Sequence, residues 1–308
     1  MPVGCCNKVY PCLLYTSDHL LTRDGIPIVS GSRRFWNLND PWAVEYLTER
    51  VIGILKDCGF QYLKVDYNDT IGIGCDDPDS LGEGLRKQAE GSLRFFERIR
   101  ENIPDIVIEN CASGGHRLTI PFLVRTSMSS FSDAHDCEEI PLIAANLHDL
   151  IPPRQNQIWA ILHRNRPVKN FYYKMAATLL GRCCLSGDIL TLTEEQWSVT
   201  EQGLDFYHQA APVIKNGVSR FHGPAITSYR HPKGWQAVER TGENGKKLIV
   251  LHTFQLEEST LFLPLKGQYT VERLYARENI RVACDGGRIL FGGLEPFDGV
   301  AVLLNPCF

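Results

Sequence analysis

The sequence lacks several features that would assign it to common functional classes. Its 32 Lys and Arg are scattered among 36 Asp and Glu, so nothing predicts the basic surface that binds nucleic acid or an anionic membrane. No apolar run approaches the length of a membrane span. No basic start followed by an apolar core marks a secretory signal. We therefore expect a cytoplasmic protein with neither nucleic-acid nor membrane partners.

The cysteines also fit no familiar pattern. There are eleven, an odd number with irregular spacing and no Cys-x-x-Cys pair, which argues against a disulfide framework and against a structural zinc site. Free thiols fit a reducing compartment. His135, Asp136, His148 and Asp149 match no standard metal-ligand spacing. We expect neither a metal nor a cofactor.

The first residues differ from the rest of the chain. Residues 12–17 read Cys-Leu-Leu-Tyr-Thr-Ser, the peptide that one reading frame of a sequencing-library transposon end encodes. We expect residues 1–17 to be a joined, non-native segment. An ordinary frayed terminus is the alternative.

From Asp40 onward, helices and strands alternate. Asp40 and Pro41 predict the start of a helix that runs to Gly59, and a buried strand follows over residues 62–65. A second helix ends before Pro104 and feeds a strand at residues 106–108. The residues expected to face inward from this second helix are Leu85, Ala89, Leu93, Phe96 and Ile99. Such alternation with short connections is typical of a parallel sheet.

Two more polar strand ends follow, at residues 127–133 and 183–188. A capping box, Thr193-Glu194-Glu195-Gln196, then predicts a helix. The residues expected to face inward from it are Trp197, Leu204, Tyr207, Ala211 and Ile214. Residues 18–216 are fewer than the roughly 250 of a complete eight-stranded barrel. We predict an α/β fold, a partial (β/α)8 TIM barrel that lacks its first strands.

Past Gly217 the hydrophobic period changes from helical to alternating, and Glu243-Asn244-Gly245 marks a hairpin turn. Residues 217–308 therefore predict a C-terminal antiparallel β-sandwich. The strands are expected at residues 236–240, 247–252, 260–263, 269–275, 288–291 and 300–304.

Polar patches follow the predicted parallel strands: residues 64–68, 109–117, 132–136 and 187–188. The carboxyl ends of barrel strands carry the chemistry of this fold. Two carboxylates that flank one bond are the machinery of retaining glycosidases. Structural alternatives remain for individual residues: Asp66 as a turn cap, Cys111 as a packed apolar group and Gly114 as part of a tight turn.

Three of these patches resemble motifs of glycoside hydrolase family 36, the α-galactosidase family of clan D. They are Lys64 to Asn68, Cys111 to Arg117 and Ser132 to Asp136, and they stand in the family's order and at similar spacing. The resemblance extends over roughly residues 25–304. It implies a hydrolase of carbohydrate metabolism that acts by a retaining mechanism.

The resemblance also implies roles for single residues. Asp66 matches the nucleophile and Asp133 the general acid/base, with Asp136 as a rival for the second role. Lys64 and Asn68 match residues that hydrogen-bond sugar hydroxyls, while Cys111 and Gly114 match the loop over the galactose ring. The family's earlier substrate-binding Arg has no ungapped counterpart. After a small shift, Arg33 or Arg34 takes its place, and we assign Arg34.

Some family features differ or are missing. Val65 stands where Trp is commoner, Ala134-His135 replaces Asn-x, and the paired Asp with a following Trp on the first barrel strand has no counterpart. We expect an α-galactosidase acting on melibiose- and raffinose-type oligosaccharides, with a parent protein that forms homo-oligomers. The alternatives are an α-N-acetylgalactosaminidase, a galactosyl-transferring enzyme of the family, and a truncated, inactive fragment that only binds sugar.

Overall fold

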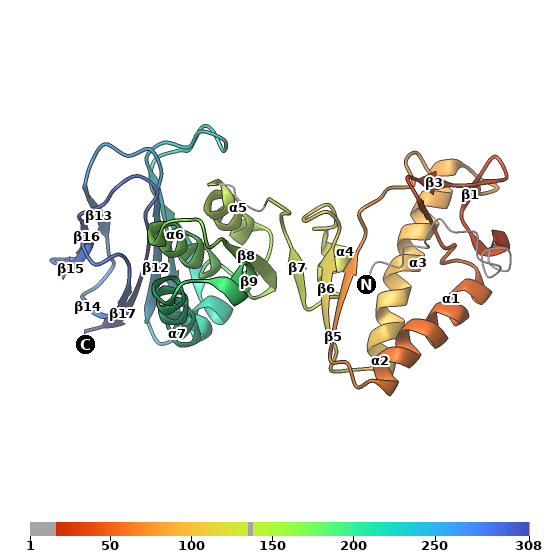
Figure 1. The fold of residues 1–308 in the computed structure, drawn as a ribbon, viewed down its shortest axis with the longest axis horizontal. Coiled ribbons are helices and arrows are strands. Elements are labelled where there is room, and N and C mark those ends of the chain that lie inside the picture. The colour runs from red at the N-terminus through yellow and green to blue at the C-terminus, as the bar shows by residue number, and fades with distance from the viewer. Residues whose placement is uncertain (1–16, 135–137, 308) are drawn as a thin grey trace. The chain divides into compact units, whose positions relative to one another are not determined.

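A computed structural model describes residues 17–134 and 138–307 (Figure 1). The chain forms two compact units, which we call unit 1 (up to Ser130) and unit 2 (from Phe131). Except for Ser17, the predicted non-native segment lies outside the described residues, and so does Asp136.

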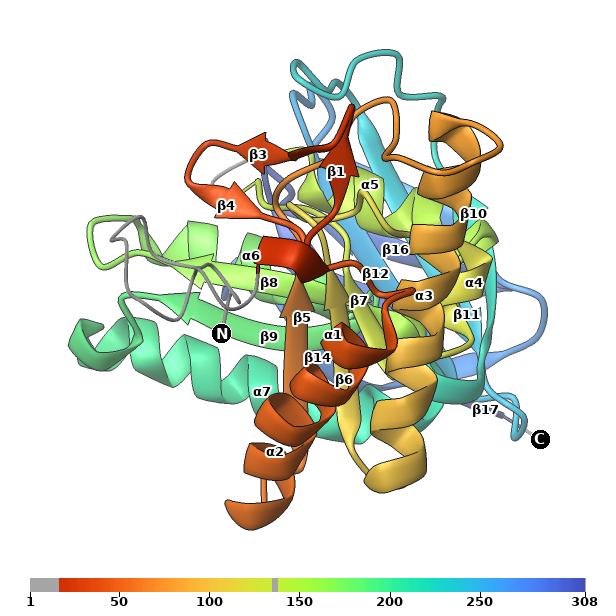
Figure 2. The same ribbon diagram turned by 90° about the vertical axis from the view of Figure 1, so that its right-hand side faces the viewer.

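Unit 1 is built on three parallel strands. They are β5 (Tyr62–Asp66), β6 (Val107–Cys111) and β7 (Met128–Ser130). Helix α3 (Leu81–Asn102) connects β5 to β6 and runs alongside them (Figure 2). Phe96 and Ile99 of this helix pack with Ile106 and Ile108. The predicted alternation of helices and parallel strands is confirmed here.

The helix that precedes β5 is not a single α-helix. Asp40 caps its start as predicted, since the side chain accepts a hydrogen bond from the Trp42 N–H at 2.8 Å. After α1 (Pro41–Leu47), however, a π-helical turn, η3 (Thr48–Ile52), comes before α2 (Gly53–Asp57). The Thr48 hydroxyl donates to the Val44 carbonyl at 2.7 Å, a contact that often bends helices.

The predicted inward face of α3 is wrong in its first half. Leu85 is 39% exposed and Ala89 is also exposed, whereas Gly84 and Gly91 are buried. A Cβ on Gly91 would lie 2.8 Å from the Leu38 carbonyl oxygen. The helix therefore turns its glycines inward, because they let neighbouring backbone approach closely.

Two small hairpins precede this region. They consist of β1 (Thr22–Arg23) with β2 (Ile26–Pro27), and β3 (Val29–Ser30) with β4 (Arg33–Arg34). Arg23 fastens the first hairpin to the segment after β5, because its Nη2 donates to the Gly74 carbonyl at 2.6 Å. A short helix, α4 (Ile120–Leu123), lies between β6 and β7.

Unit 2 begins with α5 (Ile140–Asn146) and two parallel strands, β8 (Asn156–Leu162) and β9 (Arg182–Gly187), joined by α6 (Val168–Thr178). Strand β8 was not predicted from the sequence pattern. Its residues are almost all buried, including Asn156 and Gln157, so it shows no alternation of polar and apolar positions.

Helix α7 (Glu194–Asn216) begins at the predicted capping box. The Thr193 hydroxyl accepts from the Gln196 N–H at 3.2 Å, and the Gln196 side chain accepts from the Thr193 N–H at 3.1 Å. Its predicted inward face is wrong at Trp197, which is 37% exposed. The buried face instead includes Gln196, Val199, Thr200, Gly203 and Phe206.

The rest of unit 2 consists of antiparallel strands in two sheets. One has the order β10-β11-β12-β17-β14 and the other the order β13-β16-β15. The strands are β10 (Val218–His222), β11 (Trp235–Thr241), β12 (Lys247–Thr253), β13 (Thr260–Pro264), β14 (Tyr269–Tyr275), β15 (Arg281–Asp285), β16 (Arg288–Gly292) and β17 (Gly299–Pro306). The six predicted strands are present with small changes of bounds, whereas β10 and β15 were missed.

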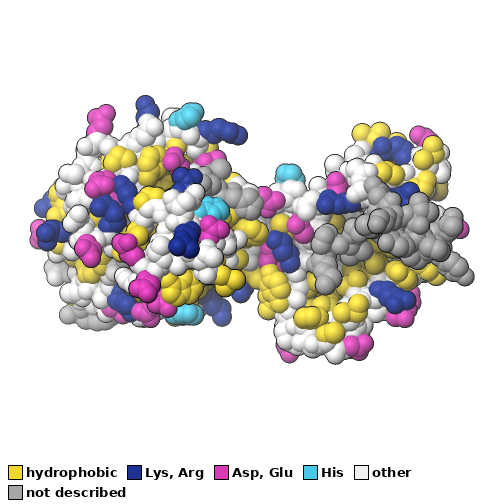
Figure 3. All heavy atoms as spheres, viewed as in Figure 1, with side chains coloured by type: hydrophobic (Ala, Val, Ile, Leu, Met, Phe, Trp, Pro, Cys, Tyr) yellow, Lys and Arg dark blue, Asp and Glu magenta, His cyan; other side chains and the backbone are white. Residues whose placement is uncertain are grey.

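Both sheets supply one apolar core, which contains Ile249 and Val302 from the first sheet and Ile289 and Phe291 from the second. Helix α6 packs on β12 and β17, where a Cβ on Gly299 would lie 2.6 Å from the Tyr173 Cα. Charges of both signs are interspersed over the face of unit 2 in Figure 3. The domain boundary at residues 216–217 stays a prediction.

Candidate active site

The carboxyl end of β5 brings together most of the predicted site residues of unit 1. Residues directly opposite each other on parallel strands point to the same face, and here Lys64 lies opposite Glu109 and Asp66 opposite Cys111. These four side chains therefore share one face of the sheet. Two carboxyl groups, one ammonium group and one thiol therefore lie together at the end of the strand.

Asn68 holds the end of this strand in place. Its Nδ2 donates to Asp66 Oδ2 at 3.2 Å, and its Oδ1 accepts from both the N–H and the hydroxyl of Ser113, at 2.9 Å and 3.0 Å. One amide thus joins the Asp66 carboxylate to the loop after β6. This contact fixes the orientation of the carboxylate.

Lys64 is paired with a buried acid that the sequence analysis did not assign to the site. Its Nζ lies 3.4 Å from Glu109 Oε1, and Glu109 is 2% exposed. The Tyr62 hydroxyl donates to the same carboxylate. Burial alone would lower the pKa of Lys64, but the charge of Glu109, aided by Cys111 and Asp66, raises it. In the sequence, the signal for Glu109 is its place directly after the predicted strand at residues 106–108, within the polar patch at residues 109–117.

Cys111 and Gly114 form a tight loop beside Asp66. Ser113 and Gly114 both have left-handed backbones, with φ of 46° and 78°, and the Ala112 N–H donates to the Gly114 carbonyl at 3.1 Å. Burial raises the pKa of the Cys111 thiol; the Gly114 N–H and Lys64 oppose this rise, and Asp66 adds to it. The thiol is therefore held in its neutral form.

Arg117 supports the residue that follows Asp66, a role that the sequence analysis also missed. Its guanidinium carbon lies 3.4 Å from the centre of the Tyr67 ring, a cation–π contact. Burial lowers the pKa of Arg117, while Tyr67 and Asp66 oppose that change. The contact joins the loop after β6 to the end of β5.

The remaining predicted residues are placed differently. Asp133 is exposed in an irregular segment of unit 2, so its pairing with Asp66 stays a prediction. Arg34 is exposed on β4. Its neighbour Arg33 forms an ion pair with Asp69 and, with Ser30, lowers the pKa of that carboxyl by hydrogen bonding. The role of Arg34 is also still a prediction.

Among residues 17–134 and 138–307, no group of three or more His, Cys, Asp or Glu is arranged to hold a metal ion. No helix in this part of the chain is both long enough and apolar enough to cross a membrane.

The family model for melibiase matches residues 18–217. The chain belongs to this family. The melibiase match includes β5 to β9, together with the loop after β6, and so contains all the residues described above.

Two curated relatives are α-galactosidases. The chain is 30% identical over 141 residues to an Escherichia coli α-galactosidase, which covers 44% of this chain and 19% of that protein. It is 23% identical over 221 residues to α-galactosidase 2 of Pediococcus pentosaceus, covering 70% of this chain and 30% of that protein. The chain thus spans less than a third of either relative.

Solved structures confirm the fold. The family 36 α-galactosidase AgaA of Geobacillus stearothermophilus, in complex with 1-deoxygalactonojirimycin, matches with a TM-score of 0.75 and 19% identity over 96% of this chain and 42% of that one. The galactosidase domain of AgaSK matches with a TM-score of 0.76 and 16% identity, over 98% and 42%. The resemblance to family 36 is confirmed, with a partial barrel and a β domain as the coarse fold.

Proposed function

We propose that this chain is the C-terminal portion of a retaining α-galactosidase. The observation that carries the proposal is the position of Asp66. In a melibiase-family chain, this acid ends a parallel strand, its carboxylate is held by Asn68, and a cationic lysine projects from the same face. In the proposed complete fold, residues 18–216 belong to a (β/α)8 barrel and residues 217–308 to its β-sandwich.

The proposed reaction has two displacements. In the first, an Asp66 oxygen forms a bond to the anomeric carbon while the bond to the leaving oxygen breaks, and that oxygen takes a proton from Asp133. In the second, Asp133 takes a proton from water, and the water oxygen displaces Asp66 from the sugar. Asp66 is thereby released as a carboxylate and Asp133 is protonated again.

The neighbouring residues would bind the sugar. Lys64, with its raised pKa, stays charged at neutral pH and would donate to hydroxyl groups. Asn68 would contribute its amide, and the loop of Cys111 and Gly114 would lie against the ring. Arg34 is proposed to add a further contact.

We propose α-galactosyl oligosaccharides as substrates, because AgaA has been solved with raffinose and with stachyose. An N-acetylgalactosaminide, or transfer of galactose in place of hydrolysis, remains the alternative within the family. An inactive sugar-binding fragment is the other candidate, favoured by the 42% of AgaA that the chain covers. A cytoplasmic location and a homo-oligomeric parent protein complete the proposal.

Hydrolysis of 4-nitrophenyl α-galactoside tests this function, in the chain itself and in the longer parent protein. We expect Asp66→Ala to lower the parent's kcat by about 10³-fold or more, and azide to restore part of the activity by replacing the missing nucleophile. Full activity of Asp66→Ala would overturn the assignment. Activity of the chain alone would exclude the inactive-fragment alternative.

A further inference from the structure

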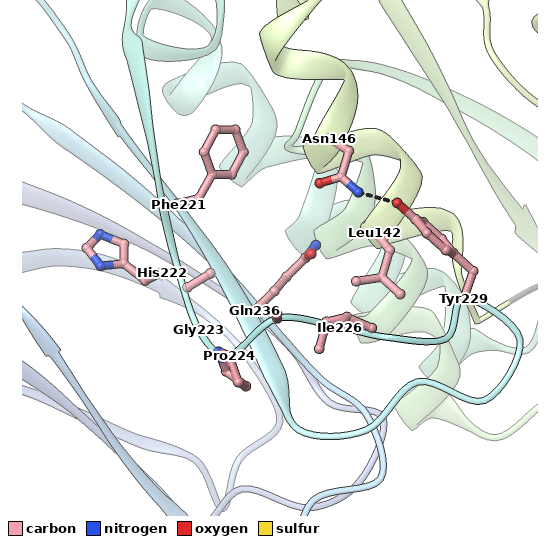
Figure 4. Close-up of a pocket in the computed structure, with 11 residues that line it drawn as sticks. Leu142, Asn146, Phe221, His222, Gly223, Pro224, Ile226, Tyr229 and Gln236 are labelled. Atoms are coloured by element: carbon pink, nitrogen blue, oxygen red, sulfur yellow. Dashed lines mark hydrogen bonds between the residues drawn. The ribbon is translucent and has the colours of Figure 1, made fainter.

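Unit 2 contains a surface cavity for which the α-galactosidase proposal gives no role. It lies between α5, β10, β11 and the segment that joins the two strands, and encloses about 230 Å³ (Figure 4). Pockets that enclose drug-sized molecules start at roughly 300 Å³. The cavity therefore has the size for a small ligand.

The lining carries no formal charge. It consists of Leu142, Asn146, Phe221, His222, Gly223, Pro224, Ala225, Ile226, Tyr229, Gln236 and Ala237. His222 is the one titratable imidazole of this set; its ring points away from Asn146 and Tyr229 (Figure 4) and bonds Glu239 at 2.9 Å. A phosphate or carboxylate ligand would find no counter-charge in the lining, so the cavity favours an uncharged molecule.

Three polar side chains of the cavity keep unused hydrogen-bonding capacity. Asn146 Nδ2 donates to the Tyr229 hydroxyl at 2.5 Å, which leaves the Tyr229 proton and Asn146 Oδ1 available. Gln236 Nε2 donates to the Pro141 carbonyl at 2.8 Å, which leaves Gln236 Oε1 available. In the described part of the chain these groups have no further partner. Each amide nitrogen also keeps a second N–H, so the three donors and two acceptors suit a ligand whose hydroxyls both donate and accept.

Aromatic and apolar surface flanks these groups. Phe221 is 42% and Tyr229 45% exposed, and the side chains of Phe221, Gln236, Asn146 and Tyr229 surround one open space in Figure 4. Leu142 and Ile226 lie beside it. Aromatic rings next to polar groups suit a ligand with one apolar face and a polar rim.

We propose that this cavity binds a neutral saccharide, with Tyr229 and Phe221 against the C–H face of one ring and Asn146 and Gln236 bonded to its hydroxyls. The lining chemistry alone supports this inference, so it does not depend on Asp66 being a nucleophile. The site would hold a sugar on unit 2 without cleaving it.

The test is raffinose binding to the full chain, measured by saturation-transfer NMR and titration calorimetry. We expect Asp66→Ala to retain this binding and the double variant Tyr229→Ala/Gln236→Leu to weaken it by about tenfold or more. Tyr229→Phe, which keeps the ring, should lose about threefold. Tyr229 is exposed, so its replacement should leave the fold intact, and circular dichroism checks the folding of each variant.

Two matched controls remove comparable groups elsewhere in unit 2: Phe262→Ala, an exposed aromatic on β13, and Gln202→Leu, an exposed amide on α7. Both should bind raffinose as the wild-type chain does. The proposal is overturned if no binding occurs, if the cavity variants bind normally, or if Asp66→Ala alone abolishes binding. Failure of the α-galactosidase proposal would show separately, in the hydrolysis assay.

Discussion

At the scale of single residues, the buried carboxylate of Glu109 depends on the groups that bind it. Glu109 is almost inaccessible, and Lys64 and Tyr62 bind its carboxylate. Removing one member of such a pair leaves the other buried without compensation.

We expect Glu109→Gln to lower the free energy of unfolding by about 2–3 kcal/mol in urea titrations. The control is Glu49→Gln, an exposed acid of η3, which should change it by less than about 0.5 kcal/mol. Equal losses in both would contradict the role of Glu109.

His252 makes stability depend on pH. It is fully buried on β12, its Nε2 donates to the Tyr173 carbonyl at 3.1 Å, and burial lowers its pKa from 6.5 to about 4. Below about pH 6.5 the unfolded chain binds a proton that the folded chain does not, so stability falls as the pH drops toward 4. At pH 5 we expect a loss of about 2 kcal/mol from this group.

The pH effect is measured by urea unfolding at pH 7.5 and pH 5. In His252→Gln the part due to this group should be absent, so the difference between the two pH values should shrink. His208→Gln, which changes an exposed histidine of α7, should leave the difference as it is in the wild type. A pH dependence unaltered by His252→Gln would show that other groups cause it.

At the scale of elements, the sequence predicted where helices and strands lie better than which side they bury. The caps at Asp40 and Thr193 are local hydrogen bonds of single residues, and for that reason they were predictable. The buried sides of α3 and α7 depend on close contacts at glycines. Neighbouring backbone lies against Gly84 and Gly91, and the side chains of Met175 and Tyr275 lie against Gly203. Hydrophobic periodicity takes no account of glycine, so it misplaced the first half of the α3 face and Trp197 of α7, while Phe96, Ile99 and Ile214 are buried as predicted.

The candidate site, too, was only partly predictable from the sequence. Lys64, Asp66 and Asn68 lie within one short motif, and the structure places them together at the end of β5. Glu109 and Arg117 join them only through the pairing of β5 with β6 and the loop that follows. Contacts between strands are not visible in spacing along one chain, which is why neither residue was assigned a role although both lie in the patch at residues 109–117.

Gly91 offers a direct test of the close helix approach. A Cβ there would lie 2.8 Å from the Leu38 carbonyl oxygen and 2.9 Å from Leu38 Cβ, so Gly91→Ala should destabilise the fold by about 1–3 kcal/mol. Helix propensity alone predicts the opposite sign, a gain of up to about 1 kcal/mol. Gly82→Ala, in the same helix with its nearest neighbour atom at 3.9 Å, should be neutral or stabilising. Thermal unfolding of both variants decides between packing and propensity.

At the scale of the whole molecule, the open sheet edge at β5 is expected to make the isolated chain self-associate. Among the described residues, β5 pairs on one side only, with β6, and Phe60 and Tyr62 beside this edge are 52% and 46% exposed. Unpaired edge strands with apolar neighbours promote association. We therefore expect the chain to self-associate at micromolar concentration in size-exclusion chromatography with light scattering.

The variant Phe60→Lys, which places a charge at the edge, should shift the chain toward the monomer. Ile120→Lys removes a comparable exposed side chain, 73% accessible on α4, and should have less effect. A wild-type chain that is monomeric and melts cooperatively would show that this edge needs no cover.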